Sequence, residues 1–206
     1  MDVPATNLCP EPPQTLETGT RTAAILIDSV ERAMHAVRSE WLFFRELRVG
    51  TGRRNGNRQR LDAFALNTLP HTAMKRVCYE VKVSRADFLA ELKHPLKRRI
   101  GMRYSNEFYF VTPADLVHVN EIPADCGLVE AGVAAPGEWK RLMARHAGCF
   151  SFDPDSRHYC LVTVPAPWRE TPGPTWQLVA AMLRHQRREW EEKPPAPPAQ
   201  QRLTFA

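Results

Sequence analysis

The sequence predicts an α/β domain whose elements follow the order helix, three strands, helix, strand. Apolar residues recur at helical spacing from about Thr22 to Arg38. Three strand-like runs follow, separated by polar segments rich in turn-forming residues. A helix-start signal at Ser84 then precedes the apolar run from Glu107 to Thr112. A chain of 206 residues is long enough for one such domain with extensions.

The first helix is expected to bury a single stripe, because its apolar residues lie three or four positions apart. They are Ala23, Leu26, Ile27, Val30, Met34 and Val37. The three strands are expected at Trp41 to Val49, Arg60 to Leu66 and Val77 to Val83. The connections, Gly50 to Gln59 and Thr68 to Arg76, favour a meander of neighbouring strands.

The second helix is expected to begin at Arg85, since Ser84 and Asp87 have the spacing of a capping pair. Phe88, Leu89 and Leu92 would supply its apolar face. Pro95 should break or kink it before the pattern continues through Leu96, Ile100 and Tyr104.

Further elements are expected after the fourth strand. They are short strands at Gly127 to Val129 and His158 to Val164, and a last helix from Trp176 to Trp190. The stripe of that last helix would contain Trp176, Val179, Leu183 and Trp190.

Composition supports one folded unit with flexible ends. Hydrophobic residues make up 43% and charged residues 25%, which excludes general disorder, collagen and coiled coil. Eight of the eighteen prolines lie near the two ends, where apolar periodicity is missing. We expect a disordered segment at 1–19, a domain at 20–192 and a flexible Pro-rich tail at 193–206. Within the domain, 22–130 would be the core and 131–192 an extension.

The five cysteines are odd in number and widely spaced, so a secreted disulfide scaffold is not expected. The N-terminus lacks the features of a secretion signal, and no apolar run approaches bilayer-spanning length. These features predict reduced thiols and a cytoplasmic location.

Positive charge is concentrated in one part of the chain. The net charge is +5, but Arg45 to Arg103 holds fifteen basic and five acidic residues, leaving the remainder at −5. A basic segment of this kind favours a polyanionic partner.

Acidic residues interrupt two of the apolar strands. In the run VCYEVKVS, alternation would place Glu80 and Lys82 on one face, opposite Tyr79 and Val81. The simplest interpretation is an exposed ion pair. However, Asp62 interrupts the preceding strand, and antiparallel pairing could bring it to Glu80. Two carboxylates, a backbone carbonyl and a phosphate would suit Mg²⁺, with Lys82 orienting the attacking water and neutralising phosphate charge.

An acid followed by E-x-K on the next strand, within this element order, resembles the PD-(D/E)XK nuclease superfamily. The likeness is sharper over Arg60 to Gly127, where RLDAFAL, YEVKVSRADFLAEL, FYFV and PADCGLVEA resemble the MmcB-type family of DNA-repair endonucleases. It implies a restriction-endonuclease-like core and an Mg²⁺- or Mn²⁺-dependent phosphodiester hydrolase. The implied metal ligands are Asp62, Glu80 and the carbonyl of Val81, with Lys82 as the catalytic lysine. The sequence departs from the family in the loop Gly50 to Gln59, before Glu80 and after Glu130.

Superfamily members often use one further acid. Glu31 in the first helix and Glu46 in the first strand compete for this role, and a solvated position is equally compatible with Glu31. Phosphate contacts are expected from basic residues, above all Arg60 and Arg85, which are nearest the acids. The others are Arg53, Arg54, Arg58, Lys93, Lys97, Arg98, Arg99 and Arg103.

Two further patterns concern binding. His146, Cys149, His158 and Cys160 would suit zinc, but their spacing matches no common finger, so buried thiols are the preferred interpretation. At the C-terminus, Gln200, Leu203 and Phe205 have the Q-x-x-L-x-F form of peptides that bind the bacterial DNA polymerase sliding clamp, which this tail resembles. A flexible tether ending in such a peptide would raise the effective concentration at the clamp.

The sequence therefore predicts a metal-dependent DNA endonuclease of DNA repair. Two alternatives stay open. One is a restriction or phage-defence nuclease, and the other is a catalytically inactive DNA-binding module on the same fold. The sequence is compatible with a monomer or a homodimer.

Overall fold

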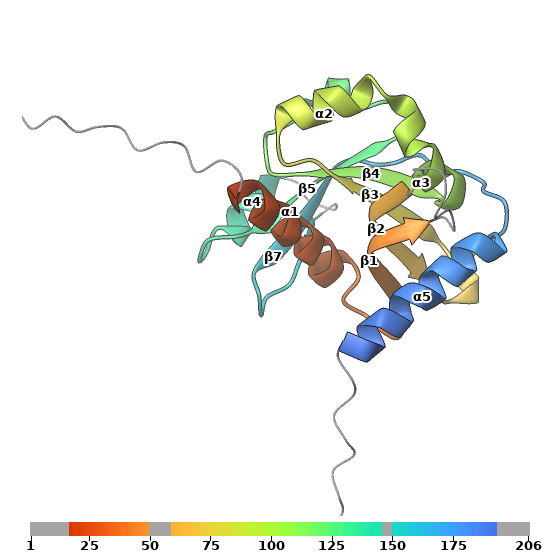
Figure 1. Ribbon diagram of the computed structural model, residues 1–206. Coiled ribbons are helices and arrows are strands. Elements are labelled where there is room, and N and C mark those ends of the chain that lie inside the picture. The colour runs from red at the N-terminus through yellow and green to blue at the C-terminus, as the bar shows by residue number, and fades with distance from the viewer. Residues whose placement is uncertain (1–16, 50–58, 146–149, 193–206) are drawn as a thin grey trace, which may run out of the picture.

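The structure is a computed structural model that describes residues 17–49, 59–145 and 150–192 (Figure 1). Several segments named above lie outside these ranges. They are most of the loop Gly50 to Gln59, including Arg53, Arg54 and Arg58, then His146 and Cys149, and the tail with Gln200, Leu203 and Phe205. The helices are α1 (Glu17–Ser29), α2 (Arg85–Leu92), α3 (Arg99–Tyr104), α4 (Trp139–Arg145) and α5 (Trp176–Glu192). A π-helical turn, Val30–Met34, continues α1, and short 3₁₀ turns lie at Pro70–Thr72, Pro95–Arg98 and Val119–Glu121.

One seven-stranded sheet runs through the described residues in the order β1-β2-β3-β4-β5-β7-β6. The strands are β1 (Trp41–Val49), β2 (Gln59–Asn67), β3 (Arg76–Val81), β4 (Glu107–Thr112), β5 (Gly127–Val133), β6 (Phe150–Phe152) and β7 (His158–Val164). β1, β2 and β3 form an antiparallel meander, and β4 and β5 continue parallel to β3. The predicted α/β class and the predicted order helix, three strands, helix, strand are therefore confirmed.

Helices cover both faces of the sheet (Figure 1). On the face that we call the α1 face, Leu26 and Val30 pack on Val77 and Tyr79. On the opposite face, the α2 face, the buried side chains of α2, α3 and α5 include Phe88, Tyr104 and Leu178, which pack with Cys78, Phe108 and Phe110 of the central strands. The alternation predicted for β3 is confirmed, because Cys78 joins one core and its neighbours Val77 and Tyr79 join the other.

The edge strand β1 changes its alternation near Glu46. Phe44 and Leu47 are three residues apart, yet both are buried in the core of the α2 face. Between them Glu46 has φ 49°, a left-handed conformation that is uncommon for a residue with a side chain. This local turn of the backbone lets the second half of β1 keep burying apolar side chains under α5.

The structure corrects several predicted boundaries. Regular α-helix ends at Ser29 and the π-turn at Met34, so the first helix does not reach Arg38, and Val37 is exposed. β3 ends at Val81 rather than Val83, although the Lys82 amide still donates to the Val111 carbonyl at 2.9 Å. β5 is longer than predicted, and β6 and α4 were not predicted. Both are short elements with little periodicity.

Side chains in three segments lie differently from the prediction. Leu89 of α2 is exposed, and Glu91 takes its place on the buried face. Arg98 is buried, with its guanidinium over the Phe110 ring. In α5 the buried stripe contains Leu178 and Ala181, while Trp176, Leu183 and Trp190 point away from the sheet and are exposed.

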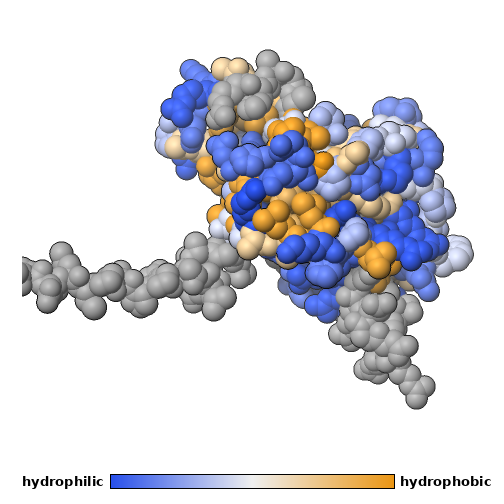
Figure 2. Space-filling model, turned by 90° about the horizontal axis from the view of Figure 1, so that it is seen from above, coloured by the Kyte–Doolittle hydropathy of each residue, from blue (hydrophilic) through white to orange (hydrophobic). Residues whose placement is uncertain are grey.

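Hydrophilic side chains dominate the face drawn in Figure 2, with hydrophobic patches between them. Among the helices in the described part of the chain, none combines the length and the apolarity needed to cross a membrane.

His35 lies at the end of the π-turn and is buried between β1 and β3. Its Nε2 is hydrogen-bonded to the Tyr79 hydroxyl at 2.8 Å, and its ring packs edge-on against Trp41. Burial, aided by the positive charge of Lys75, lowers the pKa of His35 from 6.5 to about 3. The folded protein therefore holds this imidazole neutral under mildly acidic conditions.

We expect His35 to make the fold acid-sensitive. Between pH 6.5 and about 3 the unfolded chain binds a proton on His35 that the folded chain does not bind. Stability should therefore fall as the pH decreases through this window, by up to about 1.4 kcal/mol per pH unit. Urea unfolding from pH 7 to pH 4 measures this slope. His35→Gln should flatten it and His71→Gln, at an exposed position, should not; an unchanged slope in His35→Gln would contradict the assignment.

Candidate functional site

The β2–β3 pairing brings Asp62 to Glu80. Ala63 lies opposite Tyr79 in this antiparallel pair, so the next residues along the two strands are Asp62 and Glu80. The Asp62 Oδ2 atom accepts a hydrogen bond from the Val81 amide at 3.0 Å. A carboxylate therefore caps the end of the β2–β3 ladder. It is the amide of Val81 that contacts Asp62, whereas the sequence assigned a role to the carbonyl of Val81.

Lys82 follows directly after β3 and reaches back to Glu80. Its Nζ donates to Glu80 Oε1 at 2.8 Å, and only 6% of the Lys82 side chain is exposed. The predicted E-x-K pair is thus formed by side chains on the α2 face. An exposed, solvated ion pair does not describe it, because the lysine is enclosed.

Two acids of α2 complete the surroundings of Lys82, and sequence reasoning missed both as site residues. The Glu91 carboxylate lies 3.4 Å from Lys82 Nζ with only 5% of its side chain exposed, and Asp87 Oδ2 lies 3.8 Å away. The other Glu91 oxygen, Oε1, is buried without a hydrogen-bond partner among the described residues. The available signal was the spacing of Phe88, Glu91 and Leu92, which places the acid in the apolar stripe of the helix.

The first turn of α2 is built as predicted. Ser84 is the N-cap, and its hydroxyl accepts a hydrogen bond from the Asp87 amide at 3.2 Å. This cap fixes where α2 starts, and so where Asp87 and Glu91 meet Lys82.

The surroundings of the site disfavour the ionised forms of its carboxylates. Burial and then the neighbouring charge of Asp62 raise the pKa of Glu80 to about 7. Burial also raises the pKa of Asp62, against the opposing effects of the Val81 amide, Lys82 and Arg60. Burial alone would lower the pKa of Lys82, but the nearby carboxylates, led by Glu80, outweigh it and raise that pKa. Lys82 is therefore an ammonium, able to donate hydrogen bonds and neutralise charge but not to accept a proton.

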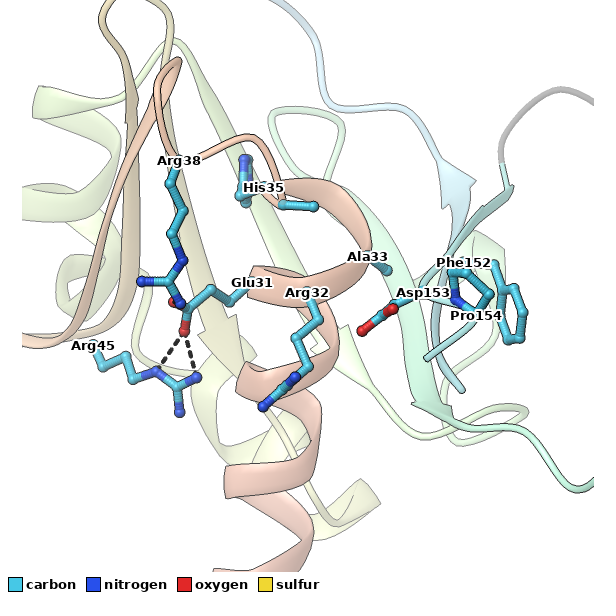
Figure 3. A pocket seen from close by; sticks show the side chains of 10 residues that line it. Glu31, Arg32, Ala33, His35, Arg38, Arg45, Phe152, Asp153 and Pro154 are labelled. Carbon is cyan, nitrogen blue, oxygen red and sulfur yellow. Dashed lines mark hydrogen bonds and ion pairs between the residues drawn. The ribbon is translucent and has the colours of Figure 1, made fainter. Parts of the chain in front are cut away.

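Of the two candidates for a further acid, Glu46 lies closer to the site. Its charge contributes to the raised pKa of Asp62, and its carboxylate pairs with Arg60 at 3.3 Å. Glu31 belongs to the π-turn on the α1 face, where it accepts a hydrogen bond from Arg45 Nε at 2.8 Å. It lines a pocket of about 320 Å³ with Arg32 and Arg38, and neither Asp62 nor Glu80 lines that pocket (Figure 3).

The basic residues of the described chain are divided between paired and free positions. Arg60 contacts Glu46 and lies 3.9 Å from Asp62. Arg85 forms two hydrogen bonds to Glu121, at 2.8 and 2.6 Å, and its side chain is exposed at the surface. Lys93 is also exposed, while Lys97 is exposed and lies 3.9 Å from Glu91. Lys93 and Lys97 are thus open to solvent on and after α2, whereas Arg60 and Arg85 already pair with carboxylates.

The residues fit a hard divalent cation with few protein ligands. Asp62 and Glu80 supply oxygen donors whose pKa values are raised by burial and, for Glu80, by mutual repulsion, which a cation would relieve. Mg²⁺ is commonly held by one or two carboxylates together with waters and substrate phosphate. Within the described residues, no group of three or more His, Cys, Asp or Glu is placed to hold a metal ion. A two-carboxylate site completed by substrate is the arrangement compatible with both observations.

The two described members of the alternative zinc set have structural contacts. Cys160 is fully buried in the core of the α1 face, and burial raises the pKa of its thiol. His158 Nδ1 is hydrogen-bonded to the Ser29 hydroxyl at 2.7 Å. Both side chains thus take part in packing α1 on β7.

Comparisons with known proteins inform the fold. No family model matches the sequence, and no curated protein matches it. Among solved structures, the chain is similar to SPO1766, a protein of unknown function from Silicibacter pomeroyi, at 15% identity and a TM-score of 0.52. The similarity covers 83% of this chain and 88% of that one. The likeness is one of fold. It supports the α/β architecture across most of the chain.

Proposed function

We propose that the protein is an Mg²⁺-dependent nuclease with a restriction-endonuclease-like core, which hydrolyses phosphodiester bonds of DNA in repair. The observation that carries the proposal is the cluster of Asp62, Glu80 and Lys82 at the end of the β2–β3 ladder. An isolated E-x-K strand needs no second acid beside it. Here a half-buried acid, Asp62, lies on the adjacent strand opposite Glu80, within the basic segment of the chain.

Each side chain has a distinct part in the proposed reaction. Asp62 and Glu80 would hold Mg²⁺, which when bound activates water and polarises the phosphate. Lys82, kept positively charged by its carboxylate neighbours, would orient the attacking water and neutralise charge that develops on the phosphate. Glu91 and Asp87 would position the lysine, since their oxygens lie within 4 Å of Nζ.

The surrounding residues would place the nucleic acid. Arg60 and Lys97 lie within 4 Å of Asp62 and Glu91, respectively, and would contact backbone phosphates. The exposed Lys93, and Arg85 once it is released from Glu121, would add further contacts. Arg53, Arg54 and Arg58 belong to the same proposal but lie outside the described residues. The same holds for the tail, in which Gln200, Leu203 and Phe205 would bind the polymerase sliding clamp.

A cleavage assay tests the proposal. Purified protein is incubated with Mg²⁺ or Mn²⁺ and with duplex, single-stranded, nicked or branched DNA, and each reaction is repeated with EDTA. We expect cleavage of at least one substrate that EDTA abolishes and that Asp62→Asn loses. Cutting that survives Asp62→Asn would assign the activity to another site or a contaminant. Binding of DNA without any cutting would favour the inactive DNA-binding module.

A further inference from the structure

The outer face of α5 carries an apolar stripe that no other element of the described residues covers. Trp176 is 86% exposed, Leu183 61% and Trp190 65%. The helix buries its opposite side, with Leu178 and Ala181 packed against the sheet. These three side chains therefore lie outside the core. A single exposed tryptophan is common on protein surfaces, but two tryptophans and a leucine on one helix face form a patch of the kind that marks an interaction site.

The three residues are spaced by seven, so they lie on one line along the helix. Leu183 stands midway between Trp176 and Trp190. A two-fold axis at Leu183 would bring an identical helix against this face in antiparallel orientation, with each residue meeting its symmetric counterpart. We propose that the protein forms a homodimer in which α5 packs antiparallel on α5 of a second copy through the stripe Trp176, Leu183 and Trp190.

Pairing in this arrangement is self-consistent. Leu183 would meet Leu183 of the partner subunit, and Trp176 would meet Trp190 of the partner subunit. The aromatic pairs at both ends would close the interface around the central leucines. Residues with these side chains are the common anchors of protein interfaces.

The distribution of charge along α5 favours the antiparallel orientation over the parallel one. Residues 176–183 carry no charge, whereas 184–192 hold all the charged side chains of the helix, including the ion pair of Arg187 and Glu191 at 2.8 Å. In a parallel pair Arg187 would face Arg187 of the partner subunit, which is repulsive. In the antiparallel pair each charged half lies along the uncharged half of the other helix.

The area is sufficient for a small interface. A tryptophan can bury up to about 250 Å², so the exposed parts of the two tryptophans alone offer roughly 350 Å² per copy. Two copies would then bury about 700 Å² before Leu183 and the flanking side chains are included. A stable interface needs about 1,000 Å² in total, which the remainder of a helix some 25 Å long can supply.

The oligomeric state of the full chain tests this inference. Sedimentation equilibrium over a range of concentrations should give a mass that rises from 23.5 kDa toward twice that value. Leu183→Asp should raise the dissociation constant at least about tenfold, while Gln177→Asp, a matched charge at an exposed position off the stripe, should not. Both positions are exposed, so thermal unfolding should show each variant folded. A wild-type monomer at all concentrations, or equal effects of the two variants, would overturn the proposal.

Cysteine cross-linking tests the orientation. In a background with Cys9 and Cys149 replaced by serine, Leu183→Cys should form a disulfide-linked dimer on mild oxidation. Trp176→Cys alone should not, and the double variant Trp176→Cys with Trp190→Cys should. Efficient linking by Trp176→Cys alone would contradict the antiparallel arrangement.

A chain that dimerises only after removal of 193–206 would mean that its own tail covers the stripe, which would also overturn the proposal. Dimerisation is independent of the proposed chemistry, so an Asp62→Asn variant should still dimerise.

Discussion

Replacing Lys82 with alanine should lower the rate of Mg²⁺-dependent DNA cleavage by about 10³-fold or more. The lysine is the only cation among the described side chains that lies within hydrogen-bond distance of Glu80, and no other described cation could take over the phosphate charge from the same position. Losing one preorganised donor to a developing negative charge typically costs 10²–10³ in rate, and a full positive charge is worth more. Single-turnover cleavage with saturating enzyme measures the chemical step.

Two controls separate catalysis from folding. Removing Lys82 leaves the half-buried carboxylate of Glu80 and the buried carboxylate of Glu91 without their cation, so Lys82→Ala should lose stability as well as activity. Lys82→Gln keeps most of the side-chain volume and a donor but no charge, and should lose a similar factor in rate while unfolding at a temperature closer to the wild type. Lys140→Ala, at an exposed lysine on α4, should leave the rate unchanged. Full activity in both Lys82 variants would remove the lysine from the mechanism.

Gly127→Ala should destabilise the fold by about 1–3 kcal/mol or more. Gly127 is the first residue of β5 and is buried against the Tyr109 ring of β4. A Cβ atom at this position would lie 2.7 Å from the backbone nitrogen of Ala166 and closer still to the Tyr109 ring. Backbone cannot move aside as a flexible side chain can, so the sheet itself must shift. Urea unfolding gives the free energy directly.

The same substitution at Gly173 is the matched control. A Cβ at Gly173 meets no atom within 4 Å, so Gly173→Ala should change stability by less than about 0.5 kcal/mol. Equal effects at the two positions would mean that the close approach of β4 and Ala166 to Gly127 is wrong.

Apolar periodicity and turn residues predicted the helices and strands. The expected pairing of the second and third strands predicted that Asp62 and Glu80 lie close together. β1 and β4 were located to the residue, because each contains a cluster of large apolar and aromatic side chains bounded by turn signals. Asp62 and Glu80 could be brought together in advance because alternation and antiparallel pairing leave few choices for two short strands.

What local patterns could not predict depends on tertiary packing. The spacing of Glu91 places it on the buried face of α2, but its partner Lys82 is set only when the helix packs over the end of β3. In α5, two faces are apolar enough to be core, and only contact with β1 decides that Leu178 rather than Trp176 faces inward. The left-handed conformation of Glu46 likewise depends on packing, because it lets both Phe44 and Leu47 enter the core of the α2 face.

The position of a bound metal ion would decide whether Asp62 and Glu80 form a metal site. Crystals of the protein with a short DNA duplex, grown with Mn²⁺ in place of Mg²⁺, would reveal the cation by its anomalous scattering. We expect a manganese peak between the carboxylates of Asp62 and Glu80, next to a DNA phosphate, and its loss in Asp62→Asn. Manganese bound only elsewhere, or a peak unchanged by Asp62→Asn, would contradict it.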